Sequence, residues 1–145
     1  MSTALVNAKQ GVYLLDTNIV SNLMHDGAGP AATHLRQGVE TGRIQAVCIS
    51  VIVDCELRFG LRKNPSKRLQ DAYAIQIARL SVLALEPSAA VIYATVREQL
   101  EAQGQPLSAN DLLIAAHALA LNATLVSADV AFARIAGLKL ENWLQ

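Results

Sequence analysis

The sequence has little of several features that would assign a protein to a class at once. Its 12 basic residues are balanced by 12 acidic ones, so no net charge announces a nucleic-acid partner, and any such attraction must come from local patches. Aromatic residues make up only 4% of the chain, and the apolar content is mainly Ala, Leu, Val and Ile. A hydrophobic share of 52% over 145 residues excludes a disordered protein and favours one globular unit of helices packed on a sheet.

Cysteines and long apolar runs are also scarce. Cys48 and Cys55 lie in apolar surroundings without the spacing of metal ligands, so we expect free, buried thiols in a reducing cytoplasm. The longest mainly apolar segment, Leu112 to Leu121, is too short to span a bilayer, and the N-terminus lacks the pattern of a signal peptide. We therefore expect a cytoplasmic protein that makes no membrane contact.

What the chain does contain is an alternation of short apolar runs with helical patterns. The runs that predict strands are Val12–Leu15, Ile44–Ile49, Ser81–Leu85, Ala123–Val126 and, at the sheet edge, Leu138–Trp143. The predicted helices are 19–24, 31–41, 51–62, 69–78, 88–101 and 108–120, with a short helical turn at 132–137. This order predicts an α/β fold, with a mostly parallel sheet of four to five strands flanked by helices. We expect a single domain over 1–145, with a loosely ordered lead-in at 1–10.

The first predicted strand stops abruptly on a carboxylate, Asp16. In open α/β sheets, ligands bind just beyond the carboxyl ends of the strands, so Asp16 is a candidate ligand for a divalent cation. The competing interpretation is an N-cap of the following helix, because Asp is a favoured capping residue. The same arrangement recurs after the fourth strand, where Ser127 and Asp129 follow Val126.

Further acids lie in the predicted helices. Asp54 and Glu56 are two residues apart and so point to nearly opposite sides. Glu56 shares the packed side with Phe59, whereas we expect Asp54 to be solvated or near a helix start. An intrahelical pair with a nearby Arg or Lys is the alternative explanation for Glu56. Asp111 follows Ser108 by three residues, as in a capping box, and the helix dipole would also hold a first-turn carboxylate ready for a metal.

Basic residues are concentrated at one place in the chain. Their candidate role is to contact a phosphate backbone, and a solvated helix end is the competing interpretation. They are Arg58, Arg62, Lys63, Lys67 and Arg68. His117 lies within an apolar helix, and we expect it to be a core or interface histidine.

The acids come from four separate segments that a parallel fold can bring to one sheet edge. Four carboxylates gathered together repel each other, so a divalent cation is their natural compensation. Oxygen ligands favour Mg²⁺ or Mn²⁺ over zinc. Such a site suits phosphodiester hydrolysis with one or two ions. The chain has no Gly-x-Ser-x-Gly elbow and no phosphate-binding P-loop to indicate another chemistry.

Short motifs recur in a specific order over nearly the whole chain. They are Leu15-Asp16-Thr17-Asn18, Glu56-Leu57-Arg58-Phe59-Gly60, Tyr93-Ala94 before Arg97, Asn110 to Ala118, Leu125 to Asp129, and Gly137-Leu138 leading to Glu141-Asn142-Trp143. In this order and spacing they resemble PIN-domain ribonucleases, specifically VapC-type toxins of bacterial type II toxin–antitoxin pairs. The resemblance implies a Mg²⁺ site and, at positions where the family has hydroxyls, two supporting residues. The implied acids are Asp16, Glu56, Asp111 and Asp129, and the supporting residues are Thr17 and Ser127.

The resemblance also implies a substrate and partners. It implies cleavage of RNA, commonly structured RNA such as transfer RNA, in the bacterial cytoplasm. It further implies a homodimer and a cognate VapB antitoxin whose tail blocks the acidic groove. We expect the dimer face on the helices around Tyr93 and Leu100, because the chain has an excess of aliphatic residues. The alternatives are a non-catalytic module that binds RNA or protein, and a DNA-directed nuclease of the same fold.

Overall fold

The computed structural model describes residues 10–145, so positions 1–9 of the expected lead-in lie outside the described residues. Its sheet has five strands in the order β3-β2-β1-β4-β5, and every neighbouring pair is parallel. The strands are β1 Val12–Leu15, β2 Ala46–Ser50, β3 Ser81–Leu83, β4 Thr124–Val126 and β5 Lys139–Glu141. The predicted α/β class and parallel sheet are confirmed.

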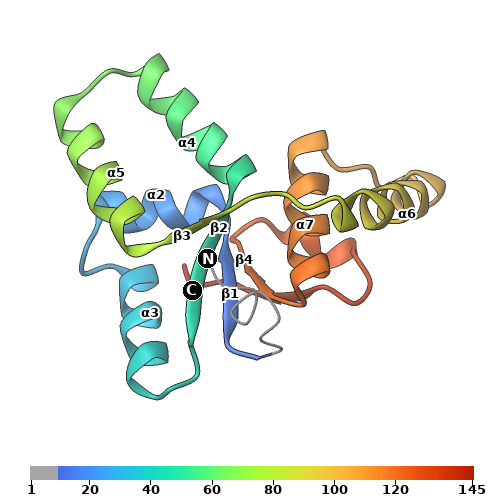
Figure 1. The fold of residues 1–145 in the computed structure, drawn as a ribbon, viewed down its shortest axis with the longest axis horizontal. Helices are drawn as coiled ribbons and strands as arrows, with labels where there is room; N and C mark the ends of the chain where they lie inside the picture. Colours follow the sequence, from blue (N-terminus) through green and yellow to red (C-terminus); the bar gives the residue numbers. More distant parts are fainter. Residues whose placement is uncertain (1–9) are drawn as a thin grey trace.

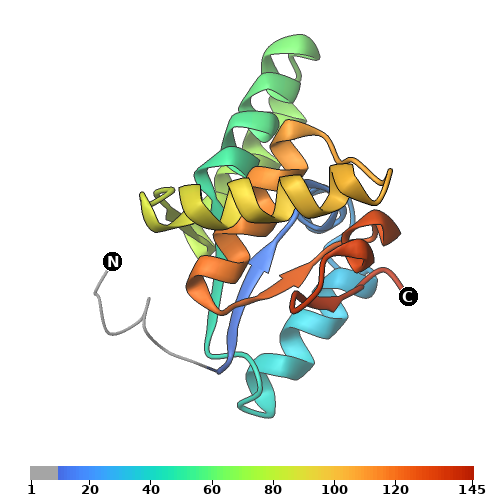
Figure 2. The ribbon, with the colours of Figure 1, turned by 90° about the vertical axis from the view of Figure 1, so that its right-hand side faces the viewer.

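Helices cover both faces of this sheet. They are α2 Thr17–His25, α3 Pro30–Glu40, α4 Val51–Lys63, α5 Lys67–Arg79, α6 Ser88–Ala102 and α7 Ala109–Leu121, followed by a 3-10 helix, η1 Val130–Arg134. Figure 1 shows α2, α3 and α5 on one side of the sheet and α6 and α7 on the other. In Figure 2, α6 crosses in front of α7, which lies between α6 and the sheet. None of the helices within residues 10–145 is long and apolar enough to cross a bilayer.

The two covered faces explain why β1 is apolar throughout. All four of its residues are buried, and Leu14 and Leu15 have no exposed surface. A strand buried on both faces carries no polar alternation, as the sequence of 12–15 predicts. Helix α7 is buried over most of its length for the same reason, because it packs between β4 and α6.

The register of the central strands places three strand ends together. Leu15 pairs with Val126 of β4, while Leu14 pairs with Cys48 of β2. Helix α2 begins two residues after β1 ends, and α4 begins directly after β2. Residues that follow β1, β2 and β4 therefore meet at one edge of the sheet, the edge at which ligands bind in this fold class.

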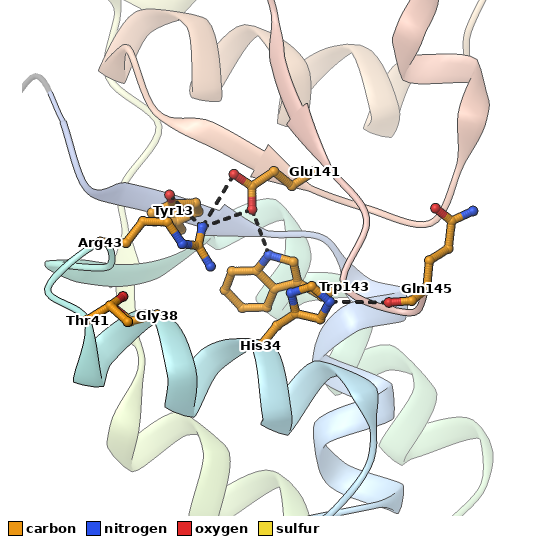
Figure 3. Close-up of polar contacts among 8 residues, drawn as sticks. All are labelled: Tyr13, His34, Gly38, Thr41, Arg43, Glu141, Trp143 and Gln145. Atoms are coloured by element: carbon orange, nitrogen blue, oxygen red, sulfur yellow. Dashed lines mark hydrogen bonds and ion pairs between the residues drawn. The ribbon is translucent and has the colours of Figure 1, made fainter.

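The edge strand β5 is tied to α3 and β1 by a polar cluster (Figure 3). Glu141 accepts hydrogen bonds from Arg43 Nη1 at 3.2 Å and from Trp143 Nε1 at 3.0 Å. The same Arg43 nitrogen donates to the hydroxyl of Tyr13 at 2.9 Å, and the Trp143 ring stacks on His34. The predicted strand 138–143 ends early, at Glu141, because Trp143 leaves the sheet edge and becomes fully buried.

The expectation that both cysteines are buried is wrong. Cys48 and Cys55 are both free, but only Cys48 is buried, because Cys55 lies on the outer side of α4. Leu100 is 2% exposed and belongs to the core, so other side chains of α6 would form the dimer face expected on this helix. On the same helix, Val91 is 73% exposed.

Candidate functional site

Asp16 lies where β1 passes into α2. Its backbone N–H donates to the carbonyl of Val126 at 2.9 Å, which extends the pairing of β1 with β4 by one residue. Its carboxylate accepts from the N–H of Thr17 at 2.9 Å, and its carbonyl accepts the first bonds of α2, so Asp16 is the N-cap. The side chain is nonetheless buried, with 5% of the residue exposed. The cap and the candidate ligand are therefore the same residue.

Ser127 and Asn18 hold the Asp16 carboxylate from the opposite side. The hydroxyl of Ser127 donates to Asp16 Oδ2 at 2.7 Å. Asn18 Nδ2 lies 3.4 Å from the same oxygen and 3.3 Å from the Ser127 hydroxyl, while Asn18 Oδ1 accepts from the N–H of Ala128 at 3.1 Å. Asn18 thus clamps α2 to the loop after β4. The sequence contained Asn18 within a motif, but nothing in its spacing revealed this bridge.

Glu56 is joined to the same site through Thr17. The Thr17 hydroxyl donates to Glu56 Oε1 at 2.6 Å, across 39 residues of sequence. None of the ion pairs among residues 10–145 involves Glu56, so the intrahelical pair that competed with the site interpretation is not formed. Thr17 therefore fixes the Glu56 carboxylate relative to the start of α2.

Asp111 enters from the other side of the sheet, in the first turn of α7. Its N–H donates to the Ser108 hydroxyl at 3.2 Å, which is the capping contact that the sequence predicted. The side chain is half-buried. Burial raises the pKa of Asp111, a hydrogen bond with Ser108 opposes the rise, and the negative charges of Asp129 and Glu56 add to it. Asp111 is therefore within electrostatic reach of acids from two other segments.

The pKa of Asp16 responds to the same set of charges. Burial raises this pKa most strongly, the hydrogen bonds from Ser127 and Thr17 lower it, and the charges of Asp111 and Glu56 raise it further. The charges of acids from α4 and α7 therefore disfavour ionisation of the acid at the end of β1. A bound cation would relieve this repulsion.

Asp129 lies at the outer end of the cluster. It is exposed, its carboxylate caps η1 by accepting from the N–H of Ala131 at 2.9 Å, and its own N–H donates to Ser127 Oγ at 3.0 Å. Its charge acts on Asp111 but is not among the causes that shift the pKa of Asp16. Asp129 is thus brought to the Asp111 side of the site.

The donor set is compatible with a hard divalent cation, although no ready-made cage exists. In the described part of the chain, no group of three or more His, Cys, Asp or Glu side chains is close enough to hold an ion. Mg²⁺, however, usually binds through one or two carboxylates and keeps several waters. The charge of Asp111 raises the pKa of the buried Asp16, and Asp16 Oδ1, which accepts only from the N–H of Thr17, keeps a lone pair free. These residues therefore fit Mg²⁺ or Mn²⁺.

A cavity of about 280 Å³ opens beside Glu56. Its polar end includes Thr17 and Ser21, and the rest of its lining comes from α2, α4 and the start of α5. The lining residues are Thr17, Ser21, Met24, His25, Glu56, Leu57, Gly60, Leu61, Asn64 and Leu69. The acidic site is thus continuous with a mostly apolar groove.

The candidate RNA-contacting cations differ in whether they already pair with an acid of the chain. Arg58 Nε donates to Asp54 at 3.0 Å, and its guanidinium lies over the ring of Tyr73. Among residues 10–145, no ion pair involves Arg62 or Lys63. Arg58 is therefore largely committed to α4 and α5, whereas the other two cations are available.

The environments of Asp54 and Phe59 differ from the sequence predictions, for Asp54 only in part. Asp54 is in the first turn of α4, as one alternative proposed, but it is buried rather than solvated. The Tyr73 hydroxyl of α5 donates to it, and Arg58 balances its charge. Phe59, expected on the packed side with Glu56, is 66% exposed, because Val53 and Leu57 form the buried face of α4.

His117 is a core residue. Its Nδ1 lies 2.8 Å from the hydroxyl of Ser50, which caps α4, and only 2% of the residue is exposed. Burial lowers the pKa of His117, and the charge of Glu86 opposes this only in part. The position of His117 is explained by a neutral, buried imidazole next to a helix cap, and no catalytic role is needed.

Comparison with known proteins places this geometry in a family. The PIN domain profile matches residues 13–138. Ribonuclease VapC2 of Rickettsia felis is 35% identical over 134 residues, which cover 91% of this chain and 98% of the relative, and Ribonuclease VapC2 of Haemophilus influenzae is 31% identical over the same shares.

Solved structures agree with these relatives. The crystal structure of VapBC2 from Rickettsia felis bound to a DNA fragment from their promoter contains a chain with a TM-score of 0.83 and 34% identity, covering 91% of this chain and 98% of that one. In the structure of VapBC-1 from nontypeable Haemophilus influenzae, the values are 0.79 and 30%, covering 92% and 99%.

Proposed function

The chain belongs to the PIN domain family, and its curated relatives are VapC ribonucleases; we propose that it is a metal-dependent endoribonuclease that acts as the toxin of a toxin–antitoxin pair in the bacterial cytoplasm. The observation that supports this most directly is the electrostatic coupling of Asp16 with Asp111 and Glu56 at the carboxyl edge of the sheet. Mutually repelling carboxylates that each carry their own hydrogen bonds are a site prepared for a cation.

We propose that Asp16 and Asp111 hold Mg²⁺ or Mn²⁺, with Glu56 and Asp129 at the two sides of the site. When bound, a divalent cation activates water and offsets the negative charge that develops on the phosphate. Ser127 and Asn18 orient the Asp16 carboxylate, and Thr17 orients that of Glu56. Partners that orient a ligating carboxylate are part of a metal site in the same way as the ligands. Glu56, held beside the groove, is placed to direct an attacking water.

The cognate partner is proposed from the same charge pattern. The solved relatives are VapBC complexes, and this chain presents an acidic edge next to an apolar groove. A VapB-type antitoxin that lays an apolar segment in the groove and places an Arg or Lys near Asp16 would block both the cation and the RNA. Within residues 10–145, none of the four site acids forms an ion pair with a basic side chain, so an antitoxin could supply the compensating charge.

A homodimer is proposed through α6. Val91 is 73% exposed on this helix. Tyr93 is half-buried and lines a cavity of about 350 Å³ together with Leu85, Glu86, Pro87, Ala89, Ala90 and Leu113. An apolar surface of this kind is typical of a protein contact. Light scattering of the purified protein tests this assignment: a dimer is expected, and Val91→Glu should convert it to a monomer.

The test of the proposed activity is cleavage of total RNA by the purified protein. Wild-type protein should cut RNA with Mg²⁺ and stop when EDTA is added, and Asp16→Asn should reduce cleavage to background. Asp71→Asn is the matched control, because Asp71 is an exposed carboxylate paired with Lys67 on α5. Single-stranded DNA of the same sequence is the second substrate. Equal cleavage by wild type and Asp16→Asn would refute the proposed metal site. Faster cleavage of the DNA than of the RNA would show that the enzyme is a deoxyribonuclease.

A further inference from the structure

Phe59 is an aromatic side chain left in solvent. It is 66% exposed, whereas Tyr13, Tyr73, Phe132 and Trp143 are all buried and Tyr93 is half-buried. Aromatic residues make up only 4% of the chain. An aromatic side chain exposed on a helix next to the candidate site therefore requires an explanation. An exposed aromatic ring that does not pack in its own fold is available to bind something else.

The position of Phe59 relates it directly to the acidic site. Phe59 follows Glu56 by three residues, and Lys63 follows Phe59 by four, on the continuous helix α4, so all three share one stripe of the helix. The Cα of Phe59 therefore lies about 4.5 Å further along the helix axis than that of Glu56. Gly60, the next residue, lines the cavity that also contains Glu56 and Thr17.

Positive charge accompanies the ring. Lys63 Nζ lies 6.0 Å from the centre of the Phe59 ring, and no ion pair within residues 10–145 holds Lys63 or its neighbour Arg62. Arg58, by contrast, is turned toward Asp54 and Tyr73. A free cation over an exposed ring, with a second free cation beside it, combines the two groups that bind single-stranded nucleic acid: a face for a base and charges for phosphates.

We propose that Phe59 stacks on an unpaired base of the RNA, one or two nucleotides from the phosphate at the acidic site, while Lys63 and Arg62 contact the backbone on the same side. This inference rests on the proposed ribonuclease function and makes it more specific. A base can stack on Phe59 only if it is not already paired within a duplex, so the enzyme selects single-stranded or looped RNA. Sequence preference from this contact is weak, because every base has a π-face.

The stripe also distinguishes RNA from a protein ligand. A protein that covered Phe59 would bring apolar groups and would have to leave Lys63 and Arg62 unpaired or supply acids to them. An RNA strand leaving the acidic site along α4 satisfies the ring and both cations at once. The charge of the stripe therefore favours the nucleic acid.

Binding of a short single-stranded RNA to the Asp16→Asn protein tests the proposal without cleavage. Phe59→Ala should weaken the affinity by about tenfold or more, the range measured when a stacking aromatic is removed. Phe59→Trp should restore the affinity, and its indole fluorescence should be quenched on binding. Phe59→Leu, which keeps apolar surface but has no π-face, should remain weak. Val39→Ala, an exposed aliphatic residue on α3, is the control and should bind like the parent.

Three results would overturn the proposal. If Phe59→Ala or Phe59→Leu bound RNA with the affinity of the parent protein, the stacking contact would be refuted. An equal loss for a fully paired duplex would show that the ring does not select unpaired bases. A Phe59→Ala protein that changes its oligomeric state in light scattering while it binds RNA normally would assign the ring to a protein contact.

The outcome is separable from that of the proposed function. In the active protein, Phe59→Ala should raise KM for single-stranded RNA and leave kcat nearly unchanged. Normal kinetics in this variant would refute the stacking contact and leave the ribonuclease intact, whereas absence of cleavage by wild type would refute the ribonuclease itself.

Discussion

At the scale of single residues, the hydroxyl of Ser127 is the junction of the acidic site. It donates to Asp16 at 2.7 Å and accepts from the N–H of Asp129 at 3.0 Å, and it is 2% exposed. The first contact ties Asp16 to the loop after β4, and the second orders that loop next to Asp129. A change at Ser127 should therefore alter the position of Asp16 without altering the charge of the site.

We predict that Ser127→Ala lowers RNA cleavage by about 10- to 100-fold, as is usual when a residue that orients a metal-ligating group is removed. Asn18→Ala should have an effect of the same kind, because it removes the clamp on Asp16 and on Ala128. Cleavage rates under saturating Mg²⁺ provide the measurement, with circular dichroism to check folding. Ser88→Ala, at the exposed start of α6, is the control, and equal losses in the control would contradict the prediction.

The raised pKa values of Asp16 and Asp111 predict how stability depends on pH in EDTA. Between the ordinary aspartate pKa, about 3.9, and the raised values, the folded state keeps protons that the unfolded state has released. The free energy of unfolding should therefore fall as pH rises through this window and stay lower above it. Asp16→Asn should lessen this fall and be more stable than wild type at pH 7 without metal.

Urea unfolding at several pH values measures this effect. Below the ordinary aspartate pKa, both states are protonated and the two proteins should differ little. Mg²⁺ should stabilise wild type and not Asp16→Asn, because only the ionised cluster binds the cation. A wild-type curve that gains stability with rising pH in EDTA would contradict the mutual repulsion of the acids.

Individual site residues could be predicted from the sequence where their position at the end of a strand or the start of a helix indicates their role. Asp16 ends an apolar run, and Asp111 follows Ser108 at a helix start, so local pattern was enough. Phe59 was predicted on the packed side but is exposed, whereas Asp54 lies near a helix start as predicted but is buried rather than solvated. The two lie on a helix with a weak apolar pattern, and their exposure depends on where α5 packs, which the sequence of α4 does not contain.

At the scale of elements, α4 carries three separate functions on its three sides. Val53 and Leu57 bury one side in the core, and Glu56 joins the acidic site through Thr17. The third contact, Asp54 with Arg58 and Tyr73, ties α4 to α5. Because these sides are distinct, the α4–α5 connection can be weakened without disturbing the acids.

We predict that Tyr73→Phe lowers the free energy of unfolding by about 1.5–3 kcal/mol, because it removes a hydrogen bond to a buried carboxylate. Burial and the neighbouring Asp54 raise the pKa of Tyr73 to about 12, so its hydroxyl remains a donor at every ordinary pH. Tyr93→Phe, whose hydroxyl accepts from Arg97 at the surface, is the matched control and should change stability by less than about 0.5 kcal/mol. Cleavage per folded molecule should be unchanged in both.

Element order was predictable from the sequence, and element ends were less so. The first predicted helix begins at Thr17 rather than Ile19. Helix α7 begins at Ala109, directly after the predicted cap Ser108 and before the apolar pattern that starts at Leu112. In both helices a polar N-cap, Asp16 or Ser108, starts the helix before the apolar pattern becomes visible.

At the scale of the whole molecule, strand order explains why the acids meet. Strand β1 lies between β2 and β4, although β2 and β4 are far apart in sequence. Their carboxyl ends deliver Asp16, the start of α4 with Glu56, and the loop with Ser127 to one edge. The sequence predicted parallel strands, but the central place of β1 follows from packing between distant segments.

We predict that a complex with the cognate antitoxin has little nuclease activity at low ionic strength and regains it as salt is added, because charge contacts with the acidic edge are screened. Cleavage by the co-purified complex, compared with protein freed of antitoxin, is the measurement. Asp71→Asn should leave the salt dependence unchanged, since this exposed residue is paired with Lys67 on α5. A complex as active as the free protein at low salt would contradict this prediction.

The hydrogen bond between Ser127 and Asp16 joins residues that are 111 positions apart. During translation at about 5–20 residues per second, the ribosome needs on the order of 10 s to add the second residue after the first. Until then the growing polypeptide holds Asp16 without the hydroxyl that orients its carboxylate. We therefore expect the site of the proposed ribonuclease to be completed only near the end of synthesis, so that a nascent chain does not cut the messenger from which it is being read.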